Sequence, residues 1–225
     1  MNQYSAVQRH SETSILATNK VIRNTYLFLG LTLAFSAIMA GVSMAQNAAP
    51  MNVFFQLIVM MGLLFSIQAT QNSPMGIVLT FVFTGFMGYT LGPLLNYFLH
   101  FVPKGQEIIL SALGGTAMIF FGASGYAMTT RQNFNYLFAF LSIGITVTFV
   151  MSLLNAFLFQ MPILSLGISC ALLLINTGFI LFETSQIING GQRNYVLATL
   201  SIYLSLYNIF ISLLQILSAF TNNRD

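Results

Sequence analysis

The sequence carries very little charge. Of its 225 residues, 5% are charged and 56% are hydrophobic, whereas about a quarter of the residues of an average soluble domain are charged. Three stretches of 80, 51 and 30 residues contain no charged side chain at all, namely 24–103, 132–182 and 194–223. Because a bilayer span needs roughly 20 mostly apolar residues, each stretch can hold one to three spans. This excludes a water-soluble globular domain and predicts an all-α, polytopic membrane protein.

Other residues that catalysis or metal binding would need are also scarce. The single cysteine, Cys170, excludes a disulfide framework and a cysteine metal site. The two histidines, His10 and His100, are too far apart for a paired-histidine zinc site. The only aspartate is Asp225, which excludes a pair of catalytic aspartates. The seven basic residues are scattered and the net charge is +3, so we expect no nucleic-acid partner. We predict no cofactor and no metal.

A short serine motif is the one catalytic pattern worth testing. Gly122-Ala123-Ser124-Gly125 matches the motif of rhomboid-type intramembrane proteases. That chemistry requires a base within hydrogen-bond reach of the serine, and no histidine follows His100 in the chain. We therefore predict that the protein is not an enzyme and has no catalytic residues.

Polar and turn-forming residues divide the apolar sequence into seven segments that can each cross a bilayer. The predicted transmembrane helices cover 26–45, 51–69, 75–99, 107–128, 134–159, 162–188 and 195–220. The break at 160–161 is so short that the fifth and sixth helices must form a tight antiparallel hairpin. No room remains for a soluble domain.

Basic residues near the ends of the spans predict the orientation, because they concentrate on the cytoplasmic side. If the N-terminus is cytoplasmic, five basic residues are inside and two, Lys104 and Arg224, are outside. The inside five are Arg9, Lys20, Arg23, Arg131 and Arg193. We predict a cytoplasmic N-terminus and a periplasmic C-terminus. Residues 1–25 form a cytoplasmic tail, 26–220 the transmembrane domain and 221–225 a short C-terminal tail.

The first span has a second interpretation. Lys20 and Arg23 precede an apolar run that ends at Ser43-Met44-Ala45, which resembles a signal peptide with a small-residue cleavage site. The polar segment ahead of this run is long, however, and the run itself can span a bilayer. We interpret it as an uncleaved first helix.

One ionisable side chain lies inside a span. Glu183 is about five residues from the end of the sixth helix, and an intramembrane ionisable group indicates function by default. Ser169 and Asn176 precede it on the same face at intervals of seven, and the seventh helix carries a polar row at steps of four and three residues. That row is Ser201, Ser205, Asn208, Ser212 and Gln215. We predict a proton- or ion-sensing site formed by Glu183, Ser201, Ser205, Asn208 and Asn176. The alternative is a structural hydrogen-bond node.

Glycine and proline mark the third span. Gly88 and Gly92 are four residues apart and form a small-residue contact face. Pro93 follows directly and is expected to kink the helix near its middle. Gly92 and Pro93 are therefore a candidate hinge.

Four stretches, 18–37, 88–93, 114–131 and 181–210, carry a resemblance to a known family. The most specific contains Leu181-Phe182-Glu183-Thr184-Ser185, then Asn189-Gly190-Gly191, then Ser205-Leu206-Tyr207-Asn208. The chain resembles the Bax inhibitor-1 family of membrane proteins and is similar to its YccA-type bacterial branch. The resemblance implies seven helices with a central last helix, in the bacterial inner membrane.

The resemblance also implies two different functions. Some family members are pH-sensitive calcium leak channels that use two carboxylates on the last two helices. Glu183 matches the first position, but Ser205 stands at the second, and the basic partner that some members have on the second helix is missing. These departures count against a calcium or proton leak, which is the alternative function.

The YccA-type branch is linked instead to the membrane AAA protease FtsH, as a modulator that restrains its digestion of membrane proteins. The polar tail of about 25 residues, rich in Asn, Gln, Ser and Thr, suits this role. Such a composition is typical of flexible segments, which a processive protease can grip. The alternative is an inert extension. We predict an integral membrane regulator of FtsH whose partners are this protease and the lipid bilayer.

Overall fold

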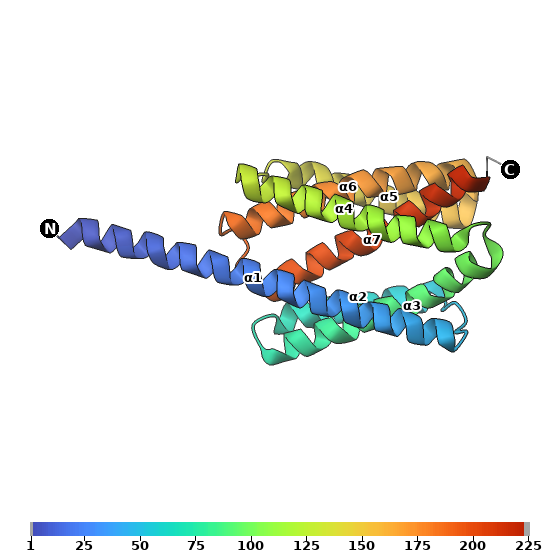
Figure 1. The fold of residues 1–225 in the computed structure, drawn as a ribbon, viewed down its shortest axis with the longest axis horizontal. Helices are drawn as coiled ribbons and strands as arrows, with labels where there is room; N and C mark the ends of the chain where they lie inside the picture. The colour runs from blue at the N-terminus through green and yellow to red at the C-terminus, as the bar shows by residue number, and fades with distance from the viewer. Residues whose placement is uncertain (1, 223–225) are drawn as a thin grey trace.

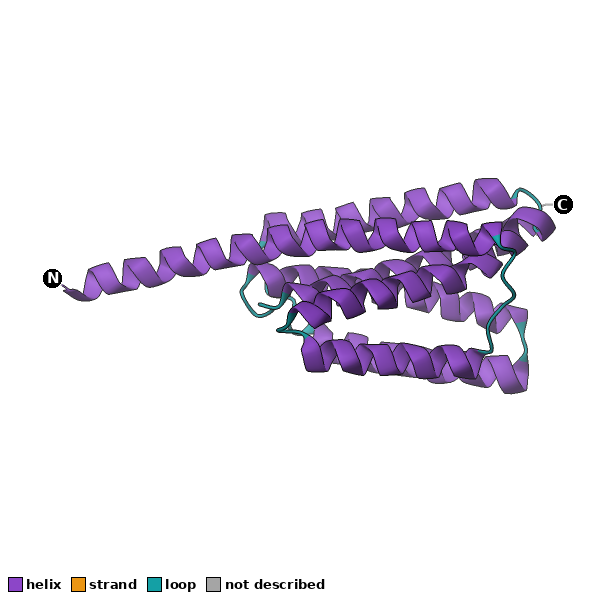
Figure 2. Cartoon of the chain, turned by 90° about the horizontal axis from the view of Figure 1, so that it is seen from below, coloured by secondary structure: helices purple, strands orange, loops and turns teal. Residues whose placement is uncertain are grey.

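The computed structural model describes residues 2–222 and, in that range, contains only helices joined by short loops (Figure 1). The helices are α1 (Asn2–Ala45), α2 (Val53–Thr70), α3 (Pro74–Phe101), α4 (Gly105–Thr130), α5 (Leu137–Leu154), the π-helix η1 (Asn155–Phe159), α6 (Pro162–Ile188) and α7 (Tyr195–Asn222). The described loops gather at the two ends of the bundle (Figure 2). The prediction of an all-α fold is confirmed.

Seven helical segments are long and apolar enough to cross a membrane, as the sequence predicts. They cover 19–45, 53–70, 74–101, 105–130, 137–159, 162–188 and 195–221. The fifth begins three residues later than the predicted 134, because residues 131–136 form a loop and a turn. Of the predicted C-terminal tail, residues 221 and 222 belong to α7, and residues 223–225 lie outside the described range.

The predicted N-terminal tail is helical in the structure. Helix α1 runs for 44 residues from Asn2, so the polar segment continues the first span without a break. This first part of α1 extends away from the other helices (Figure 1). The flexibility of the segment and the domain division based on it stay predictions.

Helix α7 lies at the centre of the bundle. Of the residues in its most apolar stretch, 61% are buried inside the protein, whereas the buried share of the corresponding stretch is 6% in the span of α2 and 11% in the span that begins with α5. It contacts α1, α3, α4 and α6, and Figure 1 shows it passing between α1 and α4. The prediction of a central last helix is confirmed. Helices α2 and α5 are peripheral.

Glycines allow α1 and α3 to approach closely. A Cβ added at Gly88 would lie 2.1 Å from the carbonyl oxygen of Ser36, and one added at Gly92 would lie 2.3 Å from Ser43 Oγ. The predicted small-residue face of α3 is therefore the face that packs on α1. Pro93 lies in the last third of α3 rather than near its middle, and the helix continues through it to Phe101. The hinge at Gly92 and Pro93 stays a prediction.

Asn155 builds the hairpin between the fifth and sixth spans. Its Nδ2 donates to Ser165 Oγ at 2.7 Å, and its Oδ1 accepts from the Met161 backbone N–H at 3.0 Å. Gln160 adopts a left-handed conformation with φ of 50°, which reverses the chain within two residues. The predicted tight hairpin is confirmed.

Candidate functional site

Glu183 lies half-buried on α6, five residues before the helix ends at Ile188. Its Oε1 accepts a hydrogen bond from Ser201 Oγ on α7 at 2.8 Å. The short loop between the two helices makes them antiparallel neighbours, which brings the carboxylate level with the first turns of α7. The structure therefore joins the predicted carboxylate to one member of the predicted polar row.

Ser205 is hydrogen-bonded within its own helix rather than to Glu183. Its side chain is buried, and its Oγ donates to the Ser201 backbone oxygen of the same helix at 3.1 Å. The Ser205 hydroxyl is thus bonded to the preceding turn of α7, and Glu183 accepts its hydrogen bond from Ser201 instead.

The other predicted site residues form a second, separate pair. Asn208 Nδ2 lies 3.5 Å from Asn176 Oδ1, at the long limit of a hydrogen bond, while Asn176 Nδ2 donates to the Leu172 backbone oxygen at 2.8 Å. Farther along the contact between the two helices, Ser169 on α6 donates to Gln215 on α7. We call this row of polar contacts, from Glu183 and Ser201 to Ser169 and Gln215, the Glu183 seam. Three members of the polar row on α7, Ser201, Asn208 and Gln215, therefore contact α6 at intervals of seven residues. The ion-sensing role of these residues stays a prediction.

Sequence reasoning missed a polar contact at the centre of the bundle. The Tyr203 hydroxyl on α7 lies 2.8 Å from Ser36 Oγ on α1 and donates to the Thr84 backbone oxygen on α3 at 3.3 Å. All three residues are buried. Tyr203 falls outside the four- and three-residue steps of the polar row, so periodicity does not identify it. These contacts join the central helix α7 to α1 and α3, and we call the cluster of Ser36, Thr84 and Tyr203 the Tyr203 node.

A second missed cluster surrounds the serine of the tested protease motif. Ser124 is buried, and its Oγ lies 3.4 Å from Thr184 Oγ1, which in turn lies 3.3 Å from the Tyr26 hydroxyl. The partner of this serine is a hydroxyl group, which cannot act as the general base that nucleophilic catalysis requires. The three hydroxyls link α4, α6 and α1.

The seam offers few ligands for a divalent cation. Within the part of the chain whose side chains are described, no three His, Cys, Asp or Glu residues come together as a metal site. A calcium ion needs six to eight oxygen ligands, and Glu183 is the one carboxylate on this seam. The arrangement suits hydrogen bonding or proton exchange better than cation retention.

Comparison with known proteins places these features in a family. The family model described as "Inhibitor of apoptosis-promoting Bax1" matches residues 18–222. The chain is 50% identical over 209 residues to the "Modulator of FtsH protease YccA" of Escherichia coli K12, covering 92% of this chain and 94% of that protein. It is 50% identical over the same lengths to the "Inner membrane protein YccA" of E. coli O6:H1. It is also 41% identical over 224 residues to an "Uncharacterized membrane protein" of Vibrio cholerae, covering 99% of this chain and 100% of that protein.

Proposed function

Because the chain belongs to the Bax inhibitor-1 family, we propose that it is an inner-membrane regulator that binds and restrains a membrane AAA protease of the FtsH type. The observation that carries this proposal is the 50% identity, over 92% of the chain, to a protein named as a modulator of that protease. The identity spans the whole bundle, so the proposal does not depend on one short motif.

The N-terminal part of α1 provides a surface for the protease. It extends away from the bundle (Figure 1), and its polar composition suits contact with a cytoplasmic partner. A protease that pulls substrates from the membrane needs an accessible segment at which to begin. Residues 1–25 are the longest polar stretch of this sequence.

The proposed orientation places this segment in the cytoplasm. Lys20, Arg23, Arg131 and Arg193 all lie at the end of the bundle where the first span begins, while Lys104 lies at the other end. Basic residues concentrate on the cytoplasmic side of inner-membrane proteins. Seven spans then place the C-terminus in the periplasm.

Removing residues 2–18 is expected to abolish the restraint. The protease, one of its membrane substrates and this protein would be reconstituted together, and the half-life of the substrate measured. The intact protein should lengthen that half-life several-fold, because its tail occupies the site at which the protease grips its membrane substrates. The shortened protein keeps all seven spans, so its loss of effect would locate the restraint in the tail.

A Gly/Ser segment of the same length in place of residues 2–18 is the matched control. If this variant restrains the protease as well as the intact protein, the sequence of the tail is irrelevant and only its length matters. An unchanged substrate half-life in the presence of the intact protein would contradict the proposed function.

A cation leak is the second candidate function, and the half-buried carboxylate of Glu183 in the sixth span is the observation that favours it. We expect Glu183→Gln to leave the restraint of the protease unchanged, because glutamine Oε1 also accepts the Ser201 hydrogen bond. The same variant should remove any proton-coupled flux, because it cannot titrate. Calcium and proton flux into liposomes at about pH 6 and pH 8 checks this. A pH-dependent flux that Glu183→Gln abolishes would favour the leak, whereas a flux equal to that of empty liposomes would leave Glu183 structural.

A further inference from the structure

The turn between the fifth and sixth spans is apolar, although turns that face water are normally polar. Of the residues 156–164, only Gln160 has a polar side chain. Five large apolar side chains in this segment are between 48% and 70% exposed. They are Phe157, Leu158, Phe159, Met161 and Ile163, and we call them the hairpin tip. An exposed apolar patch of this kind marks an interaction surface.

The other two connections at the same end of the bundle are polar. The α1–α2 connection contains Gln46, Asn47 and Asn52, and the α3–α4 connection contains Lys104. The hairpin tip, in contrast, lies in the middle of the 51-residue stretch 132–182 that has no charged side chain. Its surroundings therefore differ from those of its two neighbours.

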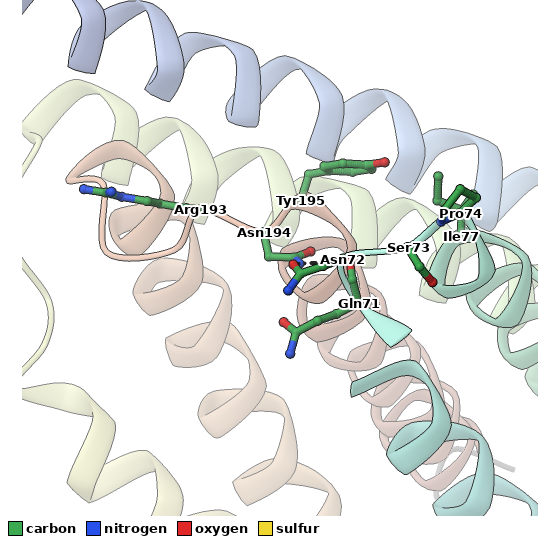
Figure 3. Close-up of a pocket in the computed structure, with 8 residues that line it drawn as sticks. All are labelled: Gln71, Asn72, Ser73, Pro74, Ile77, Arg193, Asn194 and Tyr195. Carbon is green, nitrogen blue, oxygen red and sulfur yellow. Dashed lines mark hydrogen bonds between the residues drawn. The ribbon is translucent and has the colours of Figure 1, made fainter. Parts of the chain in front are cut away.

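Connections at the opposite end are polar as well. Figure 3 shows Asn72 of the α2–α3 turn beside Asn194 of the α6–α7 loop, with the side chain of Arg193 pointing away from them. Asn194 Nδ2 donates to the Gln71 backbone oxygen and to Asn72 Oδ1, both at 3.0 Å. Its Oδ1 accepts from two backbone N–H groups in the first turn of α7, which caps that helix. The hairpin tip is the exception among the connections of this bundle.

Asn155 satisfies the backbone of the apolar turn from inside the protein. Its Oδ1 accepts from the Met161 N–H at 3.0 Å, and its Nδ2 donates to the Met161 carbonyl oxygen at 3.3 Å. The Gln160 N–H donates to the Asn155 backbone oxygen at 2.7 Å, and Pro162 has no N–H. Residues 160–162 therefore leave no backbone N–H that needs water. Backbone groups must be paired in this way where a chain meets the apolar part of a bilayer.

The length of the fifth span places the hairpin tip at the edge of the hydrocarbon. The span covers 23 residues, 137–159, and at a rise of 1.5 Å per residue it is about 34 Å long. The hydrocarbon core is about 30 Å thick, so a span that begins at one edge of the core ends just past the other. Apolar surfaces at this level sink roughly 5–10 Å into the boundary between headgroups and acyl chains. The hairpin tip therefore has acyl chains within reach.

The first turn of α2 extends the same surface. The rings of Phe54 and Phe157 stack with 5.8 Å between their centroids and 19° between their planes, and both side chains are more than half exposed. The Phe54 N–H donates to Asn52 Oδ1 at 2.9 Å, so the start of α2 is capped by the protein as well. The hairpin tip is thus continuous with the lipid-facing sides of the two peripheral helices, α2 and α5. This continuity identifies acyl chains as what covers it.

We propose that the hairpin tip and Phe54 insert among the acyl chains of the leaflet at the end of the bundle opposite the N-terminus, with Asn155 taking the place of water on the backbone of the turn. The α5–α6 hairpin is then an anchor in that leaflet and not a loop in the aqueous phase. This proposal rests on neither the orientation of the protein nor its action on a protease.

The test uses the absence of tryptophan from the sequence. Phe159→Trp places a single indole in the hairpin tip of the full-length protein, which is reconstituted in phosphatidylcholine nanodiscs. Its fluorescence should lie at short wavelength and lose most of its intensity when the lipids carry bromine on their acyl chains. Dissolved iodide should leave it nearly unchanged. Bromine near the headgroup should quench more than bromine near the chain end, and the reverse order would contradict a position at the edge of the hydrocarbon.

Ala49→Trp is the matched control, because Ala49 is an exposed residue of the polar α1–α2 connection at the same end. Iodide should quench this variant strongly and brominated lipid only weakly. If iodide quenches Phe159→Trp as strongly as Ala49→Trp, the hairpin tip lies in water and the proposal is wrong. Quenching by neither reagent would mean that protein, such as a second copy of the chain, covers the tip, and this would also overturn it. Leu158→Trp, at a position that is 70% exposed, repeats the measurement if the larger ring at 159 prevents folding.

The role of Asn155 is tested by adding Asn155→Ala to Phe159→Trp. Iodide quenching should rise toward that of the control, because the Met161 N–H and carbonyl lose their partner and draw water into the turn. Ser165→Ala in the same background removes only the hydroxyl that accepts from Asn155 Nδ2, so it should leave the indole protected. If Asn155→Ala also leaves it protected, Asn155 does not replace water and that part of the proposal is wrong.

Discussion

Gly88→Ala is expected to lower the free energy of unfolding by about 3 kcal/mol, toward the upper end of what overpacking a buried contact costs. The added Cβ would lie 2.1 Å from the carbonyl oxygen of Ser36 and 2.7 Å from its Oγ. A backbone oxygen cannot move aside as the end of a flexible side chain can, so α1 and α3 would have to separate. Because the sequence has no tryptophan, unfolding is best followed by circular dichroism during titration with dodecyl sulfate.

Gly41→Ala provides the comparison for that variant. Gly41 is an exposed residue of α1, and nothing lies within 4 Å of a Cβ added there. Alanine also favours a helix over glycine by up to about 1 kcal/mol, so this variant should be as stable as the wild type or slightly more so. Equal stability of Gly88→Ala and Gly41→Ala would show that close packing of α1 on α3 contributes nothing.

Tyr203→Ala is expected to cost about 3 to 4 kcal/mol, because it empties a fully buried site at the centre of the bundle. The ring of Tyr203 packs edge-on against Phe83, with 6.3 Å between centroids, and the residue is 1% exposed. Tyr203→Phe keeps the ring and removes only the hydrogen bonds to Ser36 and Thr84. Hydrogen bonds between transmembrane helices contribute about 0.6 kcal/mol each, so this variant should lose about 1 kcal/mol.

The same titration checks both substitutions of Tyr203. Tyr126→Ala, at an exposed position of α4, should change the unfolding free energy by less than about 0.5 kcal/mol. If Tyr203→Phe loses as much stability as Tyr203→Ala, the hydroxyl rather than the packing of the ring holds the central helix.

The number and limits of the spans could be predicted from the sequence, because the chain has long stretches without charge. Inside a bilayer such a stretch must satisfy its own backbone hydrogen bonds, so it forms a helix. The pairing of Glu183 with Ser201 was also within reach. A short loop fixes α6 and α7 as antiparallel neighbours, and the polar rows on both helices repeat at matching intervals.

The Tyr203 node could not be predicted, since its three members come from α1, α3 and α7 and share no spacing along the chain. Helices that are apolar all round do not reveal which face meets which neighbour. Asn194 was missed for a related reason. Its role in joining the α2–α3 turn to α7 depends on contacts 122 and 123 residues away in sequence, and a single asparagine in a loop carries no signal of this.

The central position of α7 has a consequence for biogenesis, because the helix at the centre of the bundle follows the other six spans along the chain and is synthesised after them. Six spans enter the membrane before the helix that joins them exists. Until then Ser36 and Thr84 lack the hydroxyl of Tyr203, and Glu183 lacks Ser201. The polar contacts that join α7 to α1, α3 and α6 therefore form only after α7 has entered the membrane. A nascent chain arrested before Tyr195 would leave the side chains of Ser36 and Glu183 without these α7 partners.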